Sequence, residues 1–163
     1  MKQFHKMYFT SKIGALELIC DGEMILALSV ADDKSIGKNS ESSCMLCQKT
    51  FQQLQEYFAG SRTKFDLPVK LDGSMLQTNV WNCLKQIPYG STVSYSEIAS
   101  AADCKSVRAV ATAIGKNPIP IIIPCHRVIH KDGTMGQFSL VGPEVKRFLL
   151  RLEQCKLSNT EID

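Results

Sequence analysis

The stretch Arg108-Ala-Val-Ala-Thr-Ala-Ile-Gly-Lys-Asn117-Pro-Ile-Pro-Ile-Ile-Ile-Pro-Cys-His-Arg-Val128 determines much of how the second half of this chain folds. Apolar residues in and just before its first part recur at helical spacing, which predicts a helix closed by Gly115 and Asn117-Pro118. Prolines at 118, 120 and 124 exclude a helix from the next part. We therefore expect 119–124 to run extended through the core and to place Cys125 and His126 at its end.

A second helix is predicted directly upstream. Ser94-Tyr-Ser-Glu97 has the pattern of a capping box, with serine at the N-cap and glutamate three residues later. The helix should extend to about Ala102, and residues 103–106 form a short polar turn before the helix that contains Arg108. Two short helices across such a turn are typical of a helix-turn-helix.

Two further helices complete the second half. Apolar residues between 76 and 87 form one stripe, which Pro88-Tyr89-Gly90 ends. The last helix should begin near Pro143, a favoured first-turn residue. It is expected to bury four apolar side chains: Val145, Phe148, Leu149 and Leu152.

The first half shows a different pattern, that of strands. Turn signals separate three segments of strand-forming residues, which predicts an antiparallel meander. The segments are Met7-Tyr-Phe-Thr, Ala15-Leu-Glu-Leu-Ile and Met24-Ile-Leu-Ala-Leu. A helix over 46–58 ends before Gly60, and Phe65-Asp-Leu adds one more expected strand. The fold class is therefore α/β of the α+β kind. We expect a sheet-plus-helix domain over residues 1–72 and a helical domain with the helix-turn-helix over 73–163.

Composition narrows the class of protein. The 163 residues carry a net charge of +3 and seven cysteines, an odd and scattered set that suits thiols in a reducing compartment. Between Lys85 and Arg151 nine Lys/Arg stand against four Asp/Glu, which fits an anionic partner such as DNA and also an ordinary solvated face. No apolar run approaches the ~20 residues of a membrane span, and the N-terminus lacks the core of a signal peptide. We expect no membrane association and a cytoplasmic location, or a nuclear one in a eukaryote.

Pro124-Cys125-His126-Arg127 is the strongest local signal for chemistry. A thiol is a weak nucleophile at neutral pH unless a base or cation raises its thiolate fraction. On an extended strand His126 would point away from Cys125, so a local turn or a bridging water is needed. Such a base also needs an acceptor on its other nitrogen, and Glu153 on the last helix is the candidate. A structural cysteine beside a satisfied histidine is the alternative that a bare Cys-His pair leaves open.

The wider pattern resembles the O6-alkylguanine-DNA alkyltransferase family. The resemblance rests on an alanine-rich helix, Asn117-Pro-Ile-Pro-Ile and then Pro124-Cys-His-Arg-Val128, and it spans roughly residues 76–154. Tyr95 before the helix-turn-helix, Lys146, and Leu149-Leu150-x-x-Glu153 extend it. Ser11-Lys-Ile-Gly14 and Leu16-Glu-Leu are more loosely similar to the N-terminal sheet of the family.

The resemblance implies a function. The chain would repair double-stranded DNA that carries O6-alkylguanine, with O4-alkylthymine as a second lesion. It would move the alkyl group irreversibly to Cys125, acting once per molecule as a monomer and without a cofactor.

The resemblance also assigns roles to residues. Cys125 would be the acceptor, His126 a base acting through water, Glu153 its orienting partner, and Asn117 a brace for the active-site turn.

Tyr95 would sit beside the 3′ phosphate of the flipped nucleotide. Arg108 would fill the vacated stack, and the small Ala109 and Ala113 would allow close approach to the minor groove. Carbonyls of Cys125 and Val128 would read the guanine amino group, the backbone at Ser139 would meet O6, and Lys146 would support the closing loop. Arg127 would be structural more often than a phosphate contact.

Two departures fall on the substrate-binding loop. The family usually has tyrosine where this chain has Phe138, and the tyrosine hydroxyl stabilises the leaving guanine. A glycine pair usually follows, where this chain reads Ser139-Leu-Val-Gly142 and is one residue longer before Lys146. These changes bear on rate and on the range of alkyl groups more than on the type of reaction.

Three other hypotheses account for parts of this pattern. A non-catalytic alkyltransferase-like protein that only binds lesions typically lacks the acceptor cysteine, which Cys125 supplies here. A Cys-His-Glu hydrolase would have no use for a helix-turn-helix. Cys44-x-x-Cys47 looks like half of a zinc site, but no second Cys or His pair has matching spacing. We therefore expect these two cysteines to pack in the core and the protein to hold no metal.

Overall fold

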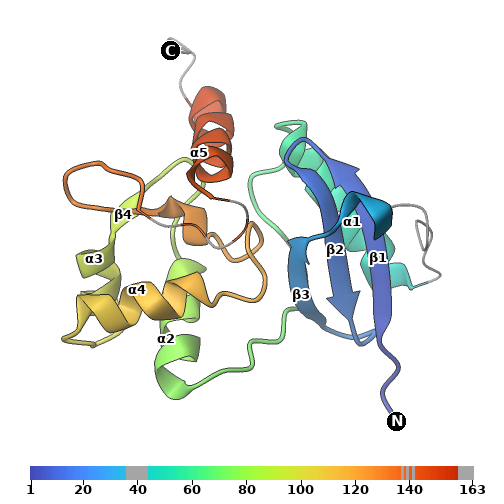
Figure 1. The fold of residues 1–163 in the computed structure, drawn as a ribbon, viewed down its shortest axis with the longest axis horizontal. Helices are drawn as coiled ribbons and strands as arrows, with labels where there is room; N and C mark the ends of the chain where they lie inside the picture. Colours follow the sequence, from blue (N-terminus) through green and yellow to red (C-terminus); the bar gives the residue numbers. More distant parts are fainter. Residues whose placement is uncertain (36–43, 137, 139, 141, 158–163) are drawn as a thin grey trace. The chain divides into compact units, whose positions relative to one another are not determined.

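The computed structural model describes residues 1–35, 44–136, 138, 140 and 142–157. The chain divides into two compact units, Met1–Lys70 and Leu71–Asp163, and each is described by itself (Figure 1).

The N-terminal unit contains a three-stranded antiparallel sheet, as predicted. Its strands are β1 (His5–Ser11), β2 (Gly14–Cys20) and β3 (Ile25–Val30), in the order β1-β2-β3. The register places Met7 opposite Leu18 and Leu18 opposite Leu28, and all three side chains are buried. Apolar residues therefore line one face of the sheet at the period of two that the sequence shows.

Helix α1 (Met45–Phe58) covers the buried face of this sheet (Figure 1). The rings of Phe9 on β1 and Phe51 on α1 lie 4.9 Å apart between centroids, and Leu54 is fully buried. Gly60 ends the helix at a φ of +79°, a left-handed conformation that glycine adopts without strain. The predicted helix and its glycine stop are confirmed.

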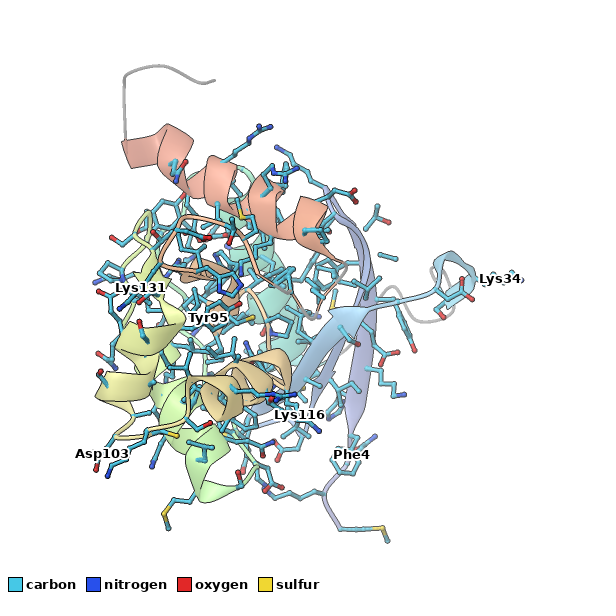
Figure 2. All side chains as sticks on the ribbon, turned by 60° about the vertical axis from the view of Figure 1, so that its left-hand side comes forward. Phe4, Lys34, Tyr95, Asp103, Lys116 and Lys131 are labelled. Carbon is cyan, nitrogen blue, oxygen red and sulfur yellow. The ribbon has the colours of Figure 1, made fainter. Side chains whose placement is uncertain are left out.

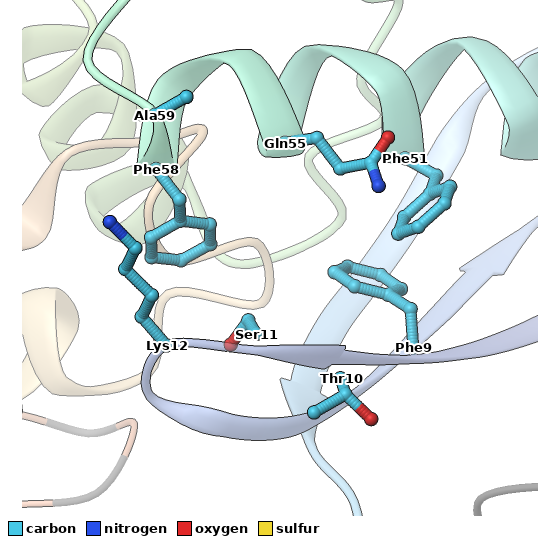
Figure 3. Close-up of a pocket in the computed structure, with 8 residues that line it drawn as sticks. All are labelled: Phe9, Thr10, Ser11, Lys12, Phe51, Gln55, Phe58 and Ala59. Atoms are coloured by element: carbon cyan, nitrogen blue, oxygen red, sulfur yellow. The ribbon is translucent and has the colours of Figure 1, made fainter.

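A cavity of about 460 Å³ opens between β1 and α1 (Figure 3). Its lining includes the rings of Phe9, Phe51 and Phe58, with Lys12 at the turn that follows β1. The eight lining residues include no His, Cys, Asp or Glu, so the hydroxyls of Thr10 and Ser11 have no histidine or carboxylate base beside them in this cavity.

The strand expected over 65–67 is wrong. Gln53 of α1 is buried, donates to the carbonyl of Asp66 at 3.2 Å and accepts from its amide at 2.9 Å. A side chain thus satisfies the backbone that a partner strand would have paired. Pairing occurs further on, where Val69 makes a single parallel bridge with Ile25. A short 3-10 turn, η1 (Asp33–Ser35), follows β3.

The C-terminal unit contains the two predicted short helices, α3 (Tyr95–Ala101) and α4 (Val107–Gly115). The Ser94 hydroxyl accepts from the Glu97 amide at 3.1 Å, and the Glu97 carboxylate accepts from the Ser94 amide at 2.6 Å. The predicted capping box is confirmed. Asp103 turns the chain between the helices at a φ of +52°, a conformation that aspartate tolerates better than most residues.

The remaining elements pack around this pair. Helix α2 (Met75–Leu84) contacts α4, and the indole Nε1 of Trp81 donates to the carbonyl of Ala113 at 2.8 Å. Strands β4 (Val93–Ser94) and β5 (Val128–Ile129) pair in parallel. Helix α5 (Pro143–Leu157) begins at the predicted proline. Of its four expected core residues Leu149 is fully buried, whereas the other three keep some exposure.

Figure 2 shows the side chains of the molecule. Tyr95 lies inside the C-terminal unit, whereas Asp103, Lys116 and Lys131 are exposed on its surface. No helix within the described ranges has both the length and the apolar character needed to cross a membrane.

Candidate active site

The segment before Cys125 is a tight turn, so the extended path expected for 119–124 is wrong. The Ile123 amide donates to the carbonyl of Ile119 at 2.9 Å, and the Cys125 amide donates to that of Ile123 at 2.8 Å. Ile121 has a φ of +73°, an unusual conformation for a β-branched residue, and is buried. The surrounding packing imposes this strain, and it turns the chain directly into the cysteine.

Asn117 holds this turn through both ends of its amide. Its Nδ2 donates to the carbonyl of Ile123 at 2.8 Å, and its Oδ1 accepts from the amide of Ile119 at 3.0 Å. Both partners are buried, as Asn117 is. A residue without the amide would leave the buried Ile119 N–H without this acceptor and would take from the Ile123 carbonyl the second of its two donors, since that carbonyl also accepts from Cys125.

Cys125 opens a single 3-10 turn, η2 (Cys125–Arg127), whose three residues are all buried. Cys125 is 3% exposed, and it is a thiol rather than half of a disulfide. The turn supplies the local bend that would let His126 act on Cys125, because consecutive side chains in a helical turn do not alternate between opposite faces as they do on a strand.

His126 forms a short hydrogen bond with the last helix. Its Nε2 lies 2.7 Å from Oε1 of Glu153, and both side chains are fully buried. Burial lowers the pKa of His126, and the Glu153 carboxylate offsets only part of that effect. We infer a neutral imidazole that donates from Nε2, because the carboxylate can only accept. Its Nδ1 then bears a lone pair and has no hydrogen-bond partner among the described residues.

Arg127 binds the same carboxylate. Its Nε donates to Oε2 of Glu153 at 2.9 Å, its Nη2 donates to Oε1 at 2.9 Å, and its Nη1 donates to the carbonyl of Ile87 at 2.7 Å. Burial on its own raises the pKa of Glu153, but the hydrogen bonds from His126 and Arg127 outweigh it and lower that pKa to about 2. Glu153 therefore stays ionised next to the imidazole.

Lys146 is a buried cation close to the cysteine. Its Nζ donates to the carbonyl of Val128 at 2.6 Å and lies 5.8 Å from the ring centroid of Tyr95. Burial lowers the pKa of Lys146 to about 8, although the negative charge of a Cys125 thiolate acts in the opposite direction. Val128, whose carbonyl is expected to read guanine, therefore already uses one lone pair for Lys146.

Tyr95 lies beside the same group of residues. It is 7% exposed, and its ring lies 4.9 Å from that of His130 between centroids. Burial and the charge of Cys125 both raise the pKa of its hydroxyl. A Cβ at Gly136 would come within 2.5 Å of that hydroxyl, so only glycine fits there. Nothing in the sequence pattern pointed to the packing of His130 on Tyr95 or to the space requirement at Gly136, and the structural role expected of Arg127 had no stated partner.

The expected DNA-facing residues of α4 separate into two groups. Arg108 is exposed at the start of the helix and Ala109 is half-exposed. Ala113 is only 3% exposed and its carbonyl accepts from Trp81, so it lies on the side of α4 that packs against α2, and its contact with a groove stays a prediction. Ala113 is small because α4 packs closely against α2. Ala111, half-exposed, and Gly115, exposed, are the other small residues of the helix.

The structure describes only some residues of the expected substrate-binding loop. Phe138 is half-buried. Ser139, expected to present its backbone to O6, lies outside the described residues.

Comparisons with known proteins agree with this geometry. Residues 4–71 match the family described as “6-O-methylguanine DNA methyltransferase, ribonuclease-like domain”, and residues 75–155 match the corresponding “DNA binding domain”. A methylated-DNA–protein-cysteine methyltransferase of Haemophilus influenzae is 36% identical over 159 residues, which cover 94% of this chain and 88% of that protein. The constitutive enzyme of that name from Bacillus subtilis is 47% identical over 104 residues, and this match spans only 63% of its length.

Solved structures extend the likeness to the fold. The crystal structure of Mycobacterium tuberculosis O6-methylguanine methyltransferase matches with a TM-score of 0.83 and 35% identity, over 97% of each chain. A structure of the M. tuberculosis protein in complex with DNA matches with a TM-score of 0.82 and 38% identity, over 93% of this chain and 94% of that one.

Proposed function

This chain belongs to the methylated-DNA–protein-cysteine methyltransferase family, and we propose that it repairs DNA by moving an alkyl group from O6 of guanine to Cys125, once per molecule. The observation that carries the proposal is the arrangement around η2. A buried thiol immediately precedes a neutral histidine whose far nitrogen binds an ionised glutamate. This is the thiol–base–orienter relationship of an activated nucleophile.

The proton of the thiol has a route to His126. Glu153 fixes the tautomer in which Nδ1 can accept, and a water between Cys125 and His126 relays the proton. Arg127 keeps Glu153 ionised and oriented without competing for Nδ1. Lys146, with a pKa of about 8, is largely cationic at neutral pH and stabilises the thiolate that forms.

The transfer itself is a displacement at carbon. The Cys125 sulfur attacks the alkyl carbon, the bond between that carbon and O6 breaks, and its electron pair goes to guanine. The proton released from the thiol, held on His126, returns to the guanine as it leaves. The product is a thioether, which has no carbonyl for water to attack, so the thiol is not regenerated and each molecule reacts once.

The lesion must leave the duplex to reach a buried thiol. Flipping a base costs a few kcal/mol of stacking and pairing. Arg108 is exposed at the start of α4, where a long cationic side chain can enter the emptied stack, and Ala109 beside it allows close approach to the minor groove. Tyr95 lies near Cys125, and we assign it to the backbone 3′ of the lesion, where it helps to rotate the nucleotide.

The flipped base is held by the loop that follows β5. Phe138 stacks on it, the carbonyls of Cys125 and Val128 accept from its amino group, and the backbone at Ser139 contacts O6. Lys146 supports this arrangement by fixing Val128 at 2.6 Å. Asn117 acts earlier in the chain, where it holds the turn that presents the sulfur.

The proposal also covers the lesions, the oligomeric state and the compartment. The partner is double-stranded DNA with O6-alkylguanine, and O4-alkylthymine is a second lesion of similar shape. We propose that the protein acts as a monomer, in the cytoplasm or in the nucleus of a eukaryote, and that residues 73–163 form the domain that carries DNA binding and alkyl acceptance. Intact-mass measurement after reaction with DNA that contains O6-methylguanine tests the proposal.

A further inference from the structure

Three cysteines gather in the N-terminal unit, far along the chain from Cys125. Cys20 ends β2, Cys44 is the N-cap of α1, and Cys47 lies in its first turn. The sulfur of Cys20 is 3.5 Å from that of Cys44 and 3.2 Å from that of Cys47. All three sulfurs lie within 4.8 Å of one another, and all three residues are buried.

The fold brings this set together from distant positions. Cys20 is separated from Cys44 by 24 residues and from Cys47 by 27. The spacing of Cys44 and Cys47 places both on one turn at the N-terminus of α1, and that terminus packs against the end of β2. None of the three is in a disulfide.

We propose that Cys20, Cys44 and Cys47 bind one Zn²⁺ ion through their sulfurs, which forms a structural metal site in the N-terminal unit. Zn²⁺ binds thiolates at about 2.3 Å in tetrahedral geometry, so bound sulfurs stand about 3.8 Å apart. The Cys20 sulfur is about 0.3 Å closer to that of Cys44 and about 0.6 Å closer to that of Cys47 than this spacing, and the sulfurs of Cys44 and Cys47 lie within 4.8 Å of each other, so side-chain adjustments of about 1 Å or less would seat the ion. This inference replaces the expectation that Cys44 and Cys47 only pack in the core.

The fourth ligand comes from solvent. Cys20 and Cys47 are fully buried, whereas Cys44 keeps 8% of its surface exposed. Cys44 is thus the least buried of the three, and a water molecule bound as the fourth ligand would approach from its side. Three thiolates and one water complete the four positions of the ion.

The charge of the site is compensated by the helix. Three thiolates and Zn²⁺ carry a net charge of −1, and the N-terminus of a helix stabilises negative charge. Helix α1 is 14 residues long and has no acidic residue in its first turn.

The ion would fasten β2 to α1 and thereby stabilise this unit. Zn²⁺ binds the three thiolates of the folded site more tightly than the dispersed thiols of the unfolded chain. Bound metal therefore raises the unfolding temperature by mass action. The site does not include Cys125 or any residue assigned to alkyl transfer. If the chain binds no Zn²⁺ at these cysteines, the proposal of alkyl transfer to Cys125 is unaffected. If Cys125 accepts no alkyl group, the metal site is likewise unaffected.

The test uses the full chain, reduced and stripped of metal, titrated with Co²⁺ and then with Zn²⁺. We expect one Co²⁺ per chain with an intense thiolate-to-cobalt charge-transfer band, which one equivalent of Zn²⁺ abolishes. Cys47→Ser and Cys20→Ser should each weaken Zn²⁺ affinity by about 100-fold or more, because losing a direct ligand exceeds the loss of an outer contact. Cys104→Ser, half-exposed in the other unit, is the matched control and should bind as the parent does.

Several results would overturn the site. One is the absence of the charge-transfer band in the unaltered chain, a measurement that does not depend on any variant folding. Another is full Zn²⁺ affinity in Cys47→Ser. A third is a Cys20–Cys47 disulfide in the chain purified without reductant, since it would identify these thiols as a redox pair.

Discussion

Nε2 of His126 and Oε1 of Glu153 lie 2.7 Å apart in a fully buried pair, and Arg127 binds the same carboxylate through two nitrogens. One carboxylate therefore orients the imidazole and neutralises a guanidinium. Removing its charge has two separable consequences, one for the rate of transfer and one for stability.

The first prediction concerns the rate. Glu153→Gln keeps the size of the side chain but cannot enforce the tautomer of His126 that leaves Nδ1 as an acceptor. The single-turnover rate of methyl transfer should fall by about 100-fold, the lower end of what a positioned base contributes. Rapid-quench assays at several pH values measure it. If the variant keeps the parental rate and pH profile, Glu153 has no part in activating the thiol.

The second prediction concerns acid stability. Glu153 has its pKa lowered from 4.5 to about 2 in the folded chain, so the unfolded chain binds a proton there that the folded chain does not. The contribution of Glu153 to the free energy of unfolding is therefore complete above about pH 4.5 and is lost as pH falls from 4.5 towards 2.

Urea titrations across this pH range measure the effect. Glu153→Gln should be less stable at neutral pH, because Arg127 loses its charged partner, and its stability should fall less steeply below pH 4.5. Glu144→Gln, at an exposed position of the same helix, should keep the parental slope. Identical slopes for Glu153→Gln and the parent would refute the assigned coupling.

The third prediction concerns base flipping. Arg108 is exposed at the start of α4 and is proposed to fill the emptied base stack. Arg108→Ala should slow repair of duplex DNA by at least about tenfold but hardly change the reaction with free O6-benzylguanine, which needs no extrusion. Lys116→Ala, at the exposed end of the same helix, is the control for lost positive charge. Equal losses on the two substrates would assign Arg108 a role other than flipping.

The fourth prediction concerns the leaving group. Negative charge develops on guanine as it departs, and Phe138 offers no proton to stabilise it. Phe138→Tyr should therefore raise the rate of methyl transfer by about tenfold and leave DNA affinity nearly unchanged, because one neutral donor contributes on the order of 1.4 kcal/mol or more. Rapid-quench transfer at saturating protein is the measurement. An unchanged or lower rate would show that this chain supplies a donor elsewhere.

Local sequence patterns predicted much of the fold because they depend on few neighbours. The capping box of Ser94 and Glu97, the glycine stop at Gly60 and the alternation of the three strands each rest on residues close together in the chain. The inward position of Glu153 followed from the apolar residues around it on α5.

Features set by tertiary packing could not be read in the same way. Prolines around Ile121 excluded a helix but did not distinguish an extended path from a strained turn held by Asn117. The sequence placed Ala113 on a helix suited to a narrow groove but did not show that Ala113 is buried where α4 packs against α2. Cys44-x-x-Cys47 lacked a second pair in sequence, and its third thiol, Cys20, comes from a strand that only the fold places beside it.

The central claim is that Cys125 accepts one alkyl group and then stops. The most direct test is the intact mass of the chain after incubation with excess duplex DNA that contains O6-methylguanine, followed by peptide mapping. The account predicts a gain of one methyl group per molecule, located on Cys125, no further turnover, and no transfer in Cys125→Ser despite retained DNA binding. Sustained turnover, or a methyl group on any other cysteine, would contradict it.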